Sequence, residues 1–157
     1  MTLLAAFAAA AAIGPCTGQA LTGTFRAVPG SAGAGNIVYA LTVRNRSRTA
    51  CFVTGVPTVT LLGARGGSLP THLQEAAAPG KLTAVLVRLA PDRTARLTAR
   101  FSPDVPGPGE PVGKTCEARA SKLRVVPNGG GSVVVPIEPP TPVCEHGRLS
   151  ATAFTAG

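Results

Sequence analysis

Four cysteines spread along 157 residues, behind an apolar N-terminal stretch, constrain most strongly what this chain can fold into. They are Cys16, Cys51, Cys116 and Cys144. An even number of cysteines after a signal-like segment is typical of a disulfide framework in an oxidising compartment. Zinc sites usually bring ligands in C-x-x-C pairs, and the sequence has none, although His146 stands close to Cys144. The sequence therefore predicts a domain held by two disulfides, with neither a metal nor a cofactor.

Four cysteines allow three pairings. We favour Cys16–Cys51 with Cys116–Cys144, because each bridge then joins neighbouring cysteines within one half of the chain. Each closes a loop of roughly 30 residues, for which the chain-entropy treatment gives about 3–4 kcal/mol as an upper estimate. Lipid attachment is the alternative for Cys16. Pro15 departs from the small residue that lipoprotein signals carry directly before the cysteine, so a disulfide is favoured there.

The N-terminus, residues 1–13, reads MTLLAAFAAAAAI and resembles a signal peptide. Its uncharged run Leu3–Ile13 suits an h-region and is shorter than the roughly 20 residues that cross a bilayer. A cationic n-region is missing, because no Lys or Arg precedes Arg26. The alternative is an alanine-rich first helix of a cytosolic protein. We assign residues 1–13 as a signal-peptide-like segment and residues 16–157 as a single domain, a size that supports one core.

Apolar and polar residues alternate through most of the chain, as in strands with one buried face. In Thr94–Phe101, for example, Arg96 and Arg100 point to one side and the apolar residues to the other. The predicted strands are Leu21–Val28, Asn36–Asn45, Cys51–Val53, Thr58–Leu62, Thr83–Leu89, Thr94–Phe101, Lys122–Val126, Ser132–Glu138 and Arg148–Phe154.

Short strands at intervals of about ten residues predict an all-β fold, an Ig-like antiparallel two-sheet sandwich of roughly 7–9 strands. The 19 Gly and 15 Pro between apolar runs supply the turns. Because the chain has no Trp, Ile, Leu, Val and a few Phe must fill the core. Only Leu69–Ala78 could form a helical turn after the leader, and Ser102–Thr115 is a proline-rich loop.

The order of cysteines and strands carries a resemblance over Cys16 to about Phe154. Its pieces are Cys16, VYALTV (38–43), NRS (45–47), CFVTGVP (51–57), Cys116, LRVVP (123–127) and Cys144. The pattern resembles an exported bacterial family, common in actinobacteria, that is catalogued only as domain of unknown function 4232. Relatives often carry an aromatic residue where this chain has Val56. The resemblance implies a secreted or envelope-attached β-sandwich with paired cysteines, and it implies no reaction.

The formal net charge is +8, with twelve Arg against three Lys. No Asp or Glu occurs before Glu75, so the first half of the chain is purely cationic. This distribution favours polyanionic surroundings such as an acidic cell-wall polymer, and a merely solvated surface is the alternative. The candidate anion-binding residues are Arg44, Arg46, Arg48, Arg96 and Arg100.

Catalytic motifs are poorly supplied. The run Gly107–Thr115 imitates a phosphate-binding loop but has Pro108 where that motif needs Gly, and its prolines remove N–H donors. The sequence has no Gly-x-Ser-x-Gly nucleophile elbow to accompany His72 or His146. A secreted hydrolase that uses either histidine is therefore only the second hypothesis about function.

Nucleic-acid binding would need exposed aromatic residues beside the basic ones. Phe25, Tyr39 and Phe101 instead fall on the inward faces of predicted strands, and we expect no nucleic-acid partner. The sequence thus predicts an exported, non-catalytic binding module that is extracellular or attached to the cell envelope. Its expected partner is an anionic cell-wall polymer or an envelope protein. A purely structural envelope domain is the third reading.

Overall fold

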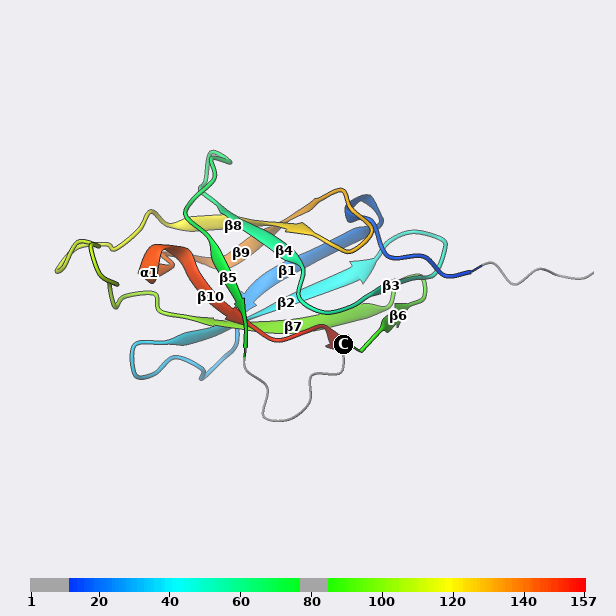
Figure 1. Cartoon of the computed structure of the whole chain (residues 1–157), viewed down its shortest axis with the longest axis horizontal. Coiled ribbons are helices and arrows are strands. Elements are labelled where there is room, and N and C mark those ends of the chain that lie inside the picture. The colour runs from blue at the N-terminus through cyan, green and yellow to red at the C-terminus, as the bar shows by residue number, and fades with distance from the viewer. Residues whose placement is uncertain (1–11, 77–84) are drawn as a thin grey trace, which may run out of the picture.

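The structure is a computed structural model that describes residues 12–76 and 85–157. These residues contain eleven strands and two short helical turns, and Figure 1 shows how most of them are arranged. The elements are η1 (Gly18–Ala20), β1 (Leu21–Ala27), β2 (Ile37–Asn45), β3 (Cys51–Val53), β4 (Thr58–Leu62), β5 (His72–Glu75), β6 (Val87–Leu89), β7 (Thr94–Phe101), β8 (Ala120–Val126), β9 (Val133–Thr141), α1 (Cys144–Gly147), β10 (Arg148–Ala151) and β11 (Thr155–Ala156).

Nine strands form one continuous sheet in the order β4-β8-β9-β1-β2-β7-β10-β5, with β11 pairing with β7. Strands β3 and β6 form a separate two-stranded sheet. The large sheet folds over so that β4, β8 and β9 face β2 and β7 across the core (Figure 1). Its two outermost strands, β4 and β5, line one groove together, so the sheet nearly closes on itself.

The all-β class and the two disulfides are confirmed. The nine strands of the large sheet do not divide into the two face-to-face sheets expected for an Ig-like sandwich, because β1 pairs antiparallel with β2 and parallel with β9. This parallel pairing, Phe25 with Ile137 and Arg26 with Glu138, ties the two layers into one sheet.

Three aromatic side chains sit at the centre of the core. The ring centroid of Tyr39 lies 5.1 Å from those of both Phe25 and Phe101, in tilted arrangements that aromatic pairs favour. The Tyr39 hydroxyl donates a hydrogen bond to the Pro139 carbonyl at 2.9 Å, which satisfies its one buried polar atom. The predicted inward direction of all three rings is confirmed.

The predicted strands agree with the observed ones to within a few residues, except at two places. The helical prediction for Leu69–Ala78 is wrong where it can be tested, because His72–Glu75 is strand β5 and pairs in parallel with β10. This non-local pairing supplies backbone partners that local sequence does not reveal. Positions 77 and 78, and positions 83 and 84 of another predicted strand, lie outside the described residues.

The second difference is α1, which was not predicted. Glu145 and His146 have φ values of 56° and 57°, in the left-handed region, and Gly147 follows with φ 79°. Strand β10 then ends at Ala151, and residues 155–156 form β11 as a separate strand on β7. A run of three left-handed residues is unfavourable for the two that carry a Cβ, so tertiary contacts must hold it.

The disulfides join Cys16 to Cys51, with Cα atoms 4.9 Å apart, and Cys116 to Cys144, with Cα atoms 5.4 Å apart. These are the pairs that the sequence favoured. In this state the Cys16 sulfur is not available for a lipid. The leader assigned to residues 1–13 lies outside the described residues except for its last two positions. Within the described ranges no helix has the length and apolar character needed to cross a bilayer.

Candidate functional site

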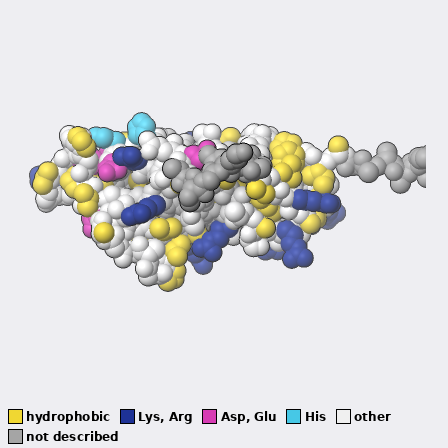
Figure 2. Space-filling model, turned by 60° about the horizontal axis from the view of Figure 1, so that its bottom comes forward, with side chains coloured by type: hydrophobic (Ala, Val, Ile, Leu, Met, Phe, Trp, Pro, Cys, Tyr) yellow, Lys and Arg dark blue, Asp and Glu magenta, His cyan; other side chains and the backbone are white. Residues whose placement is uncertain are grey.

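Arg44, Arg96 and Arg100 lie on one solvent-facing surface formed by β2 and β7, and we call this surface the arginine face. The two strands are antiparallel neighbours, with Thr42 opposite Arg96 and Arg44 opposite Thr94. The intervening residues of β7 point into the core, so both arginines on this strand point outward. Arg96 and Arg100 are four residues apart, about 13 Å along the strand. Figure 2, which brings this side forward, shows several Lys and Arg side chains and few acidic ones.

The arginines of this face differ in how they are partnered. Arg44 donates to Asp92 at 2.7 Å, an exposed ion pair. Within residues 12–76 and 85–157, Arg96 and Arg100 have no carboxylate within 4.0 Å of a guanidinium nitrogen. Their charge is therefore available to an external anion.

Threonine hydroxyls surround the arginines of this face. The backbone register places Thr24, Thr42, Arg96 and Thr155 side by side on four adjacent strands. Since hydroxyl groups both donate and accept hydrogen bonds, the surface offers charged and neutral donors within about 5 Å of one another across the strands.

Arg46 and Arg48, the other two predicted anion-binding residues, are separate from the arginine face. They lie in the exposed loop after β2. The Arg46 Nε atom donates to the Gln19 carbonyl at 3.0 Å, which fixes part of its side chain against η1. The five predicted residues therefore form one surface and one loop rather than a single patch.

Two arginines at the edges of the face were missed by sequence reasoning. Arg26 on β1 pairs with Glu138, and Arg148 on β10 pairs with Glu145 at 3.5 Å. Arg100 and Arg148 line a groove of about 230 Å³ together with Ser150, which is opposite Arg100 in the sheet. Both lie in predicted strands, but only the strand order shows which neighbours they join.

A second polar cluster, which is rich in acidic side chains, lies around α1. The carboxylate of Glu110 is buried, with its side chain 2% exposed. It accepts backbone N–H hydrogen bonds from Gly107 at 2.6 Å, Glu145 at 2.8 Å and His146 at 2.6 Å. Burial by itself would raise the pKa of this carboxyl, but the three N–H donors and nearby His146 together hold it below its ordinary value. This carboxylate is what holds the left-handed turn.

His146 completes the cluster. Its Nε2 atom lies 2.9 Å from the Pro108 carbonyl, and its Nδ1 lies 3.6 Å from Glu117 and 3.8 Å from Glu110. The Pro108 carbonyl, which accepts from the ring, raises the pKa of His146. Desolvation opposes this rise, and the charges of the two carboxylates add to it. The protonated imidazole is therefore favoured between these groups.

Glu110, Glu117 and His146 each place one potential ligand atom within 4.8 Å of the others. Both oxygens of Glu110 already accept backbone hydrogen bonds, so this carboxylate is committed to the fold. The nearby sulfurs of Cys116 and Cys144 are joined in a disulfide and are not thiolate ligands. The contacts of this cluster are therefore made within the fold, where they stabilise the α1 turn.

The two histidines considered for hydrolysis lie in different places. His72 is exposed on β5, and His146 lies in the α1 turn. Across the described part of the chain, neither imidazole is within hydrogen-bonding distance of a Ser, Thr or Cys side chain. A nucleophile activated by an adjacent base requires such a contact.

Residues 16–155 match the model of a family whose description reads Domain of unknown function (DUF4232). No curated protein and no solved structure matches the chain. The family match covers nearly all of the described residues, including both disulfides and the arginine face.

Proposed function

The chain belongs to the family described as Domain of unknown function (DUF4232), the family that its cysteine and strand pattern resembles, and on this premise we propose that it is an exported, non-catalytic binding module. Its ligand would be an anionic polymer of the cell envelope or an acidic envelope protein. Binding would take place on the arginine face. We also propose that the folded-over sheet serves as an Ig-like scaffold, with the arginine face on the outside of one layer.

The observation that carries this proposal is the state of Arg96 and Arg100. In the described residues both guanidinium groups are exposed and unpaired with carboxylate, beside threonine hydroxyls on three neighbouring strands. Guanidinium groups bind phosphate and carboxylate through paired N–H donors, and hydroxyl groups suit the sugars or polyols of such polymers. The net charge of +8 would attract polyanions over a longer range.

Export is supported by the two disulfides, which persist in oxidising compartments and are rare in the cytosol. The signal-peptide-like residues 1–13 point the same way. Among residues 12–76 and 85–157 no Ser, Thr or Cys side chain lies within hydrogen-bonding distance of either histidine, which supports binding over hydrolysis.

The experiment is retention of the disulfide-bonded protein on beads that carry teichoic acid, eluted by a salt gradient. We expect Arg96→Glu with Arg100→Glu to elute at much lower salt than the wild type, because the surface loses its unpaired cations. The matched control is Arg65→Glu with Arg119→Glu, two exposed residues outside the face whose replacement changes the net charge equally. We expect this control to elute close to the wild type.

A third variant, Arg46→Glu with Arg48→Glu, separates the loop after β2 from the arginine face. Equal shifts in all three double variants would mean that net charge alone causes retention, and would contradict a defined site. No retention of the wild type on this polymer or on pulled-down envelope proteins would favour a purely structural domain.

A further inference from the structure

The large sheet fails to close between its outermost strands, β4 and β5. The two strands are held together at one end, where the Leu69 N–H donates to the Leu61 carbonyl at 2.8 Å and the Leu61 N–H donates to Thr71 Oγ1 at 2.9 Å. After Thr71 the chain leaves β4 to pair with β10. The diverging strands leave a groove of about 390 Å³, and we call it the β4–β5 wedge. Its lining includes Pro57, Val59, Thr71, Leu73 and Glu75.

Backbone groups of β4 point into this wedge. The N–H and C=O groups of Leu61 point away from β8, as the two hydrogen bonds above show. Successive residues of a strand alternate in this respect, so those of Val59 point the same way. In the described ranges no backbone partner is found for Val59.

Backbone groups of β5 point into the wedge from the other side. The Ala76 N–H donates to the Ala151 carbonyl of β10 at 2.7 Å, so Gln74, two residues earlier, also faces β10. By the same alternation, the N–H and C=O groups of Leu73 and Glu75 point away from β10, toward β4. Among the described residues these groups have no backbone partner either.

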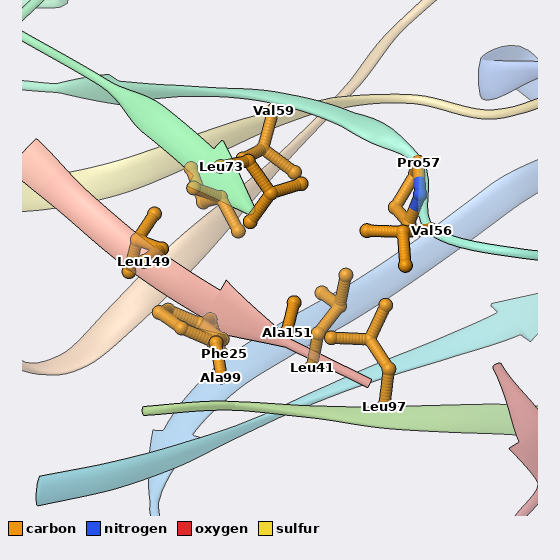
Figure 3. A pocket seen from close by; sticks show the side chains of 11 residues that line it. Phe25, Leu41, Val56, Pro57, Val59, Leu73, Leu97, Ala99, Leu149 and Ala151 are labelled. Atoms are coloured by element: carbon orange, nitrogen blue, oxygen red, sulfur yellow. The ribbon is translucent and has the colours of Figure 1, made fainter. Parts of the chain in front are cut away.

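The floor of the wedge is apolar. Figure 3 shows Val59 and Leu73 close together above Leu149, Ala151 and Phe25. These five residues belong to the lining of a small pocket beneath the wedge, and all 11 residues of that lining are apolar. The pocket below them holds about 10 Å³, room for about one water molecule. The core is therefore closed, and an occupant would rest side chains on this floor without entering it.

We propose that the β4–β5 wedge binds an extended segment of another protein, which adds a strand that pairs with both β4 and β5. Unpaired N–H and C=O groups on facing walls are satisfied by a peptide backbone, and alternate side chains of that peptide would meet the apolar floor. A lipid chain would leave the backbone groups unsatisfied. A second copy of this chain is disfavoured by repulsion between two molecules of net charge +8, and Glu75 is the one charged side chain among the described lining residues, so the segment is uncharged where it lies in the wedge.

The test uses a synthetic fluorescein-labelled peptide of alternating Val and Thr with one Asp at each end, and measures its affinity by fluorescence anisotropy. The variant Glu75→Pro removes an outward N–H and leaves the hydrogen bonds to β10 in place. We expect it to bind the peptide about fivefold to tenfold more weakly than the wild type, from the loss of one hydrogen bond. The matched variant Glu75→Ala keeps the N–H and should bind like the wild type. Equal affinity of the two variants would overturn the proposal.

Backbone amide hydrogen exchange tests the same groups without a substitution, in case Glu75→Pro fails to fold. The amides of Val59, Leu73 and Glu75 should exchange quickly in the free protein and slowly with the peptide bound, while Gln74 stays protected in both states. No gain of protection at these amides would contradict the proposal. A concentration-dependent dimer that protects the same amides without peptide would replace the proposed segment with a second copy. Neither result depends on the arginine face, whose retention on teichoic acid is unaffected by Glu75→Pro.

Discussion

The α1 turn lies at one end of the molecule and β3 at the other (Figure 1), and the two ends have similar disulfides but different buried polar groups. At the Cys51 end, beside the Cys16–Cys51 bridge, the fully buried Asn45 side chain donates to the carbonyls of Thr49 at 2.8 Å and Leu89 at 3.0 Å and accepts from the Ser47 N–H at 2.9 Å. At the Cys144 end, the buried carboxylate of Glu110 has the same organising role. The neutral amide of Asn45 organises one end, and the charged carboxylate of Glu110 organises the other.

This difference determines at which end of the molecule the hydrogen bonds depend on pH. The hydrogen bonds of Asn45 do not change with protonation. Those of Glu110 depend on its charge, and they hold a left-handed turn that is locally unfavourable.

The largest effects should come from the disulfides, and they should be alike at both ends. The pairs close loops with sequence separations of 35 and 28 residues. Because loop entropy varies slowly with length, replacing either pair by Ala should lower the free energy of unfolding by about 3–4 kcal/mol. Urea denaturation at pH 7 measures this. A much larger loss for one pair would show that the two bridges do not act as equal constraints.

The polar groups should produce the next largest effects and divide the two ends. Glu110→Gln should cost about 1–3 kcal/mol at pH 7, because buried N–H donors lose a charged acceptor, and Asn45→Ala should cost a similar amount. The pKa of Glu110 is lowered from 4.5, so its contribution is present above that value and is lost as the pH falls through the folded-state pKa. The cost of Glu110→Gln should therefore vanish in strong acid, while that of Asn45→Ala persists. Urea titrations at neutral and acid pH test this, and a constant cost for Glu110→Gln would contradict it.

The smallest effect should belong to His146. Its pKa is raised above 6.5, so its contribution is complete below that value and is lost as the pH rises through the folded-state pKa. The wild type should lose a little thermal stability between mildly acid and mildly alkaline pH, and His146→Gln should abolish this slope. The control His72→Gln, on β5, should keep it. An unchanged slope in His146→Gln would remove this side chain from the pH response.

The sequence predicted the strands because most of them alternate cleanly between core and solvent, as Thr94–Phe101 does. It missed β5 because the segment HLQE has no such alternation and becomes a strand only by pairing with β10, far along the chain. It missed the α1 turn for the same reason. The acceptor that holds Glu145 and His146 in place is Glu110, which local sequence presents as a solvated loop residue.

The arginine face was predicted in part. Alternation gave the outward direction of Arg96 and Arg100. The pairing of β2 with β7 places Arg44 on the same surface, whereas Arg46 and Arg48 lie in the loop after β2. Strand order depends on long-range pairing, which no local pattern encodes. Nothing in the sequence indicated the β4–β5 wedge, because it arises where the chain leaves one strand to join another.

The position of β1 between β2 and β9 also governs the order in which this chain can fold. β1 finds its first neighbour within the next twenty or so residues, but its second neighbour, Val133–Thr141, follows it by roughly a hundred residues. A chain that emerges from its N-terminus keeps one edge of β1 open until β9 has been made. Such long-range pairing slows folding, so the closing of the core becomes a late event.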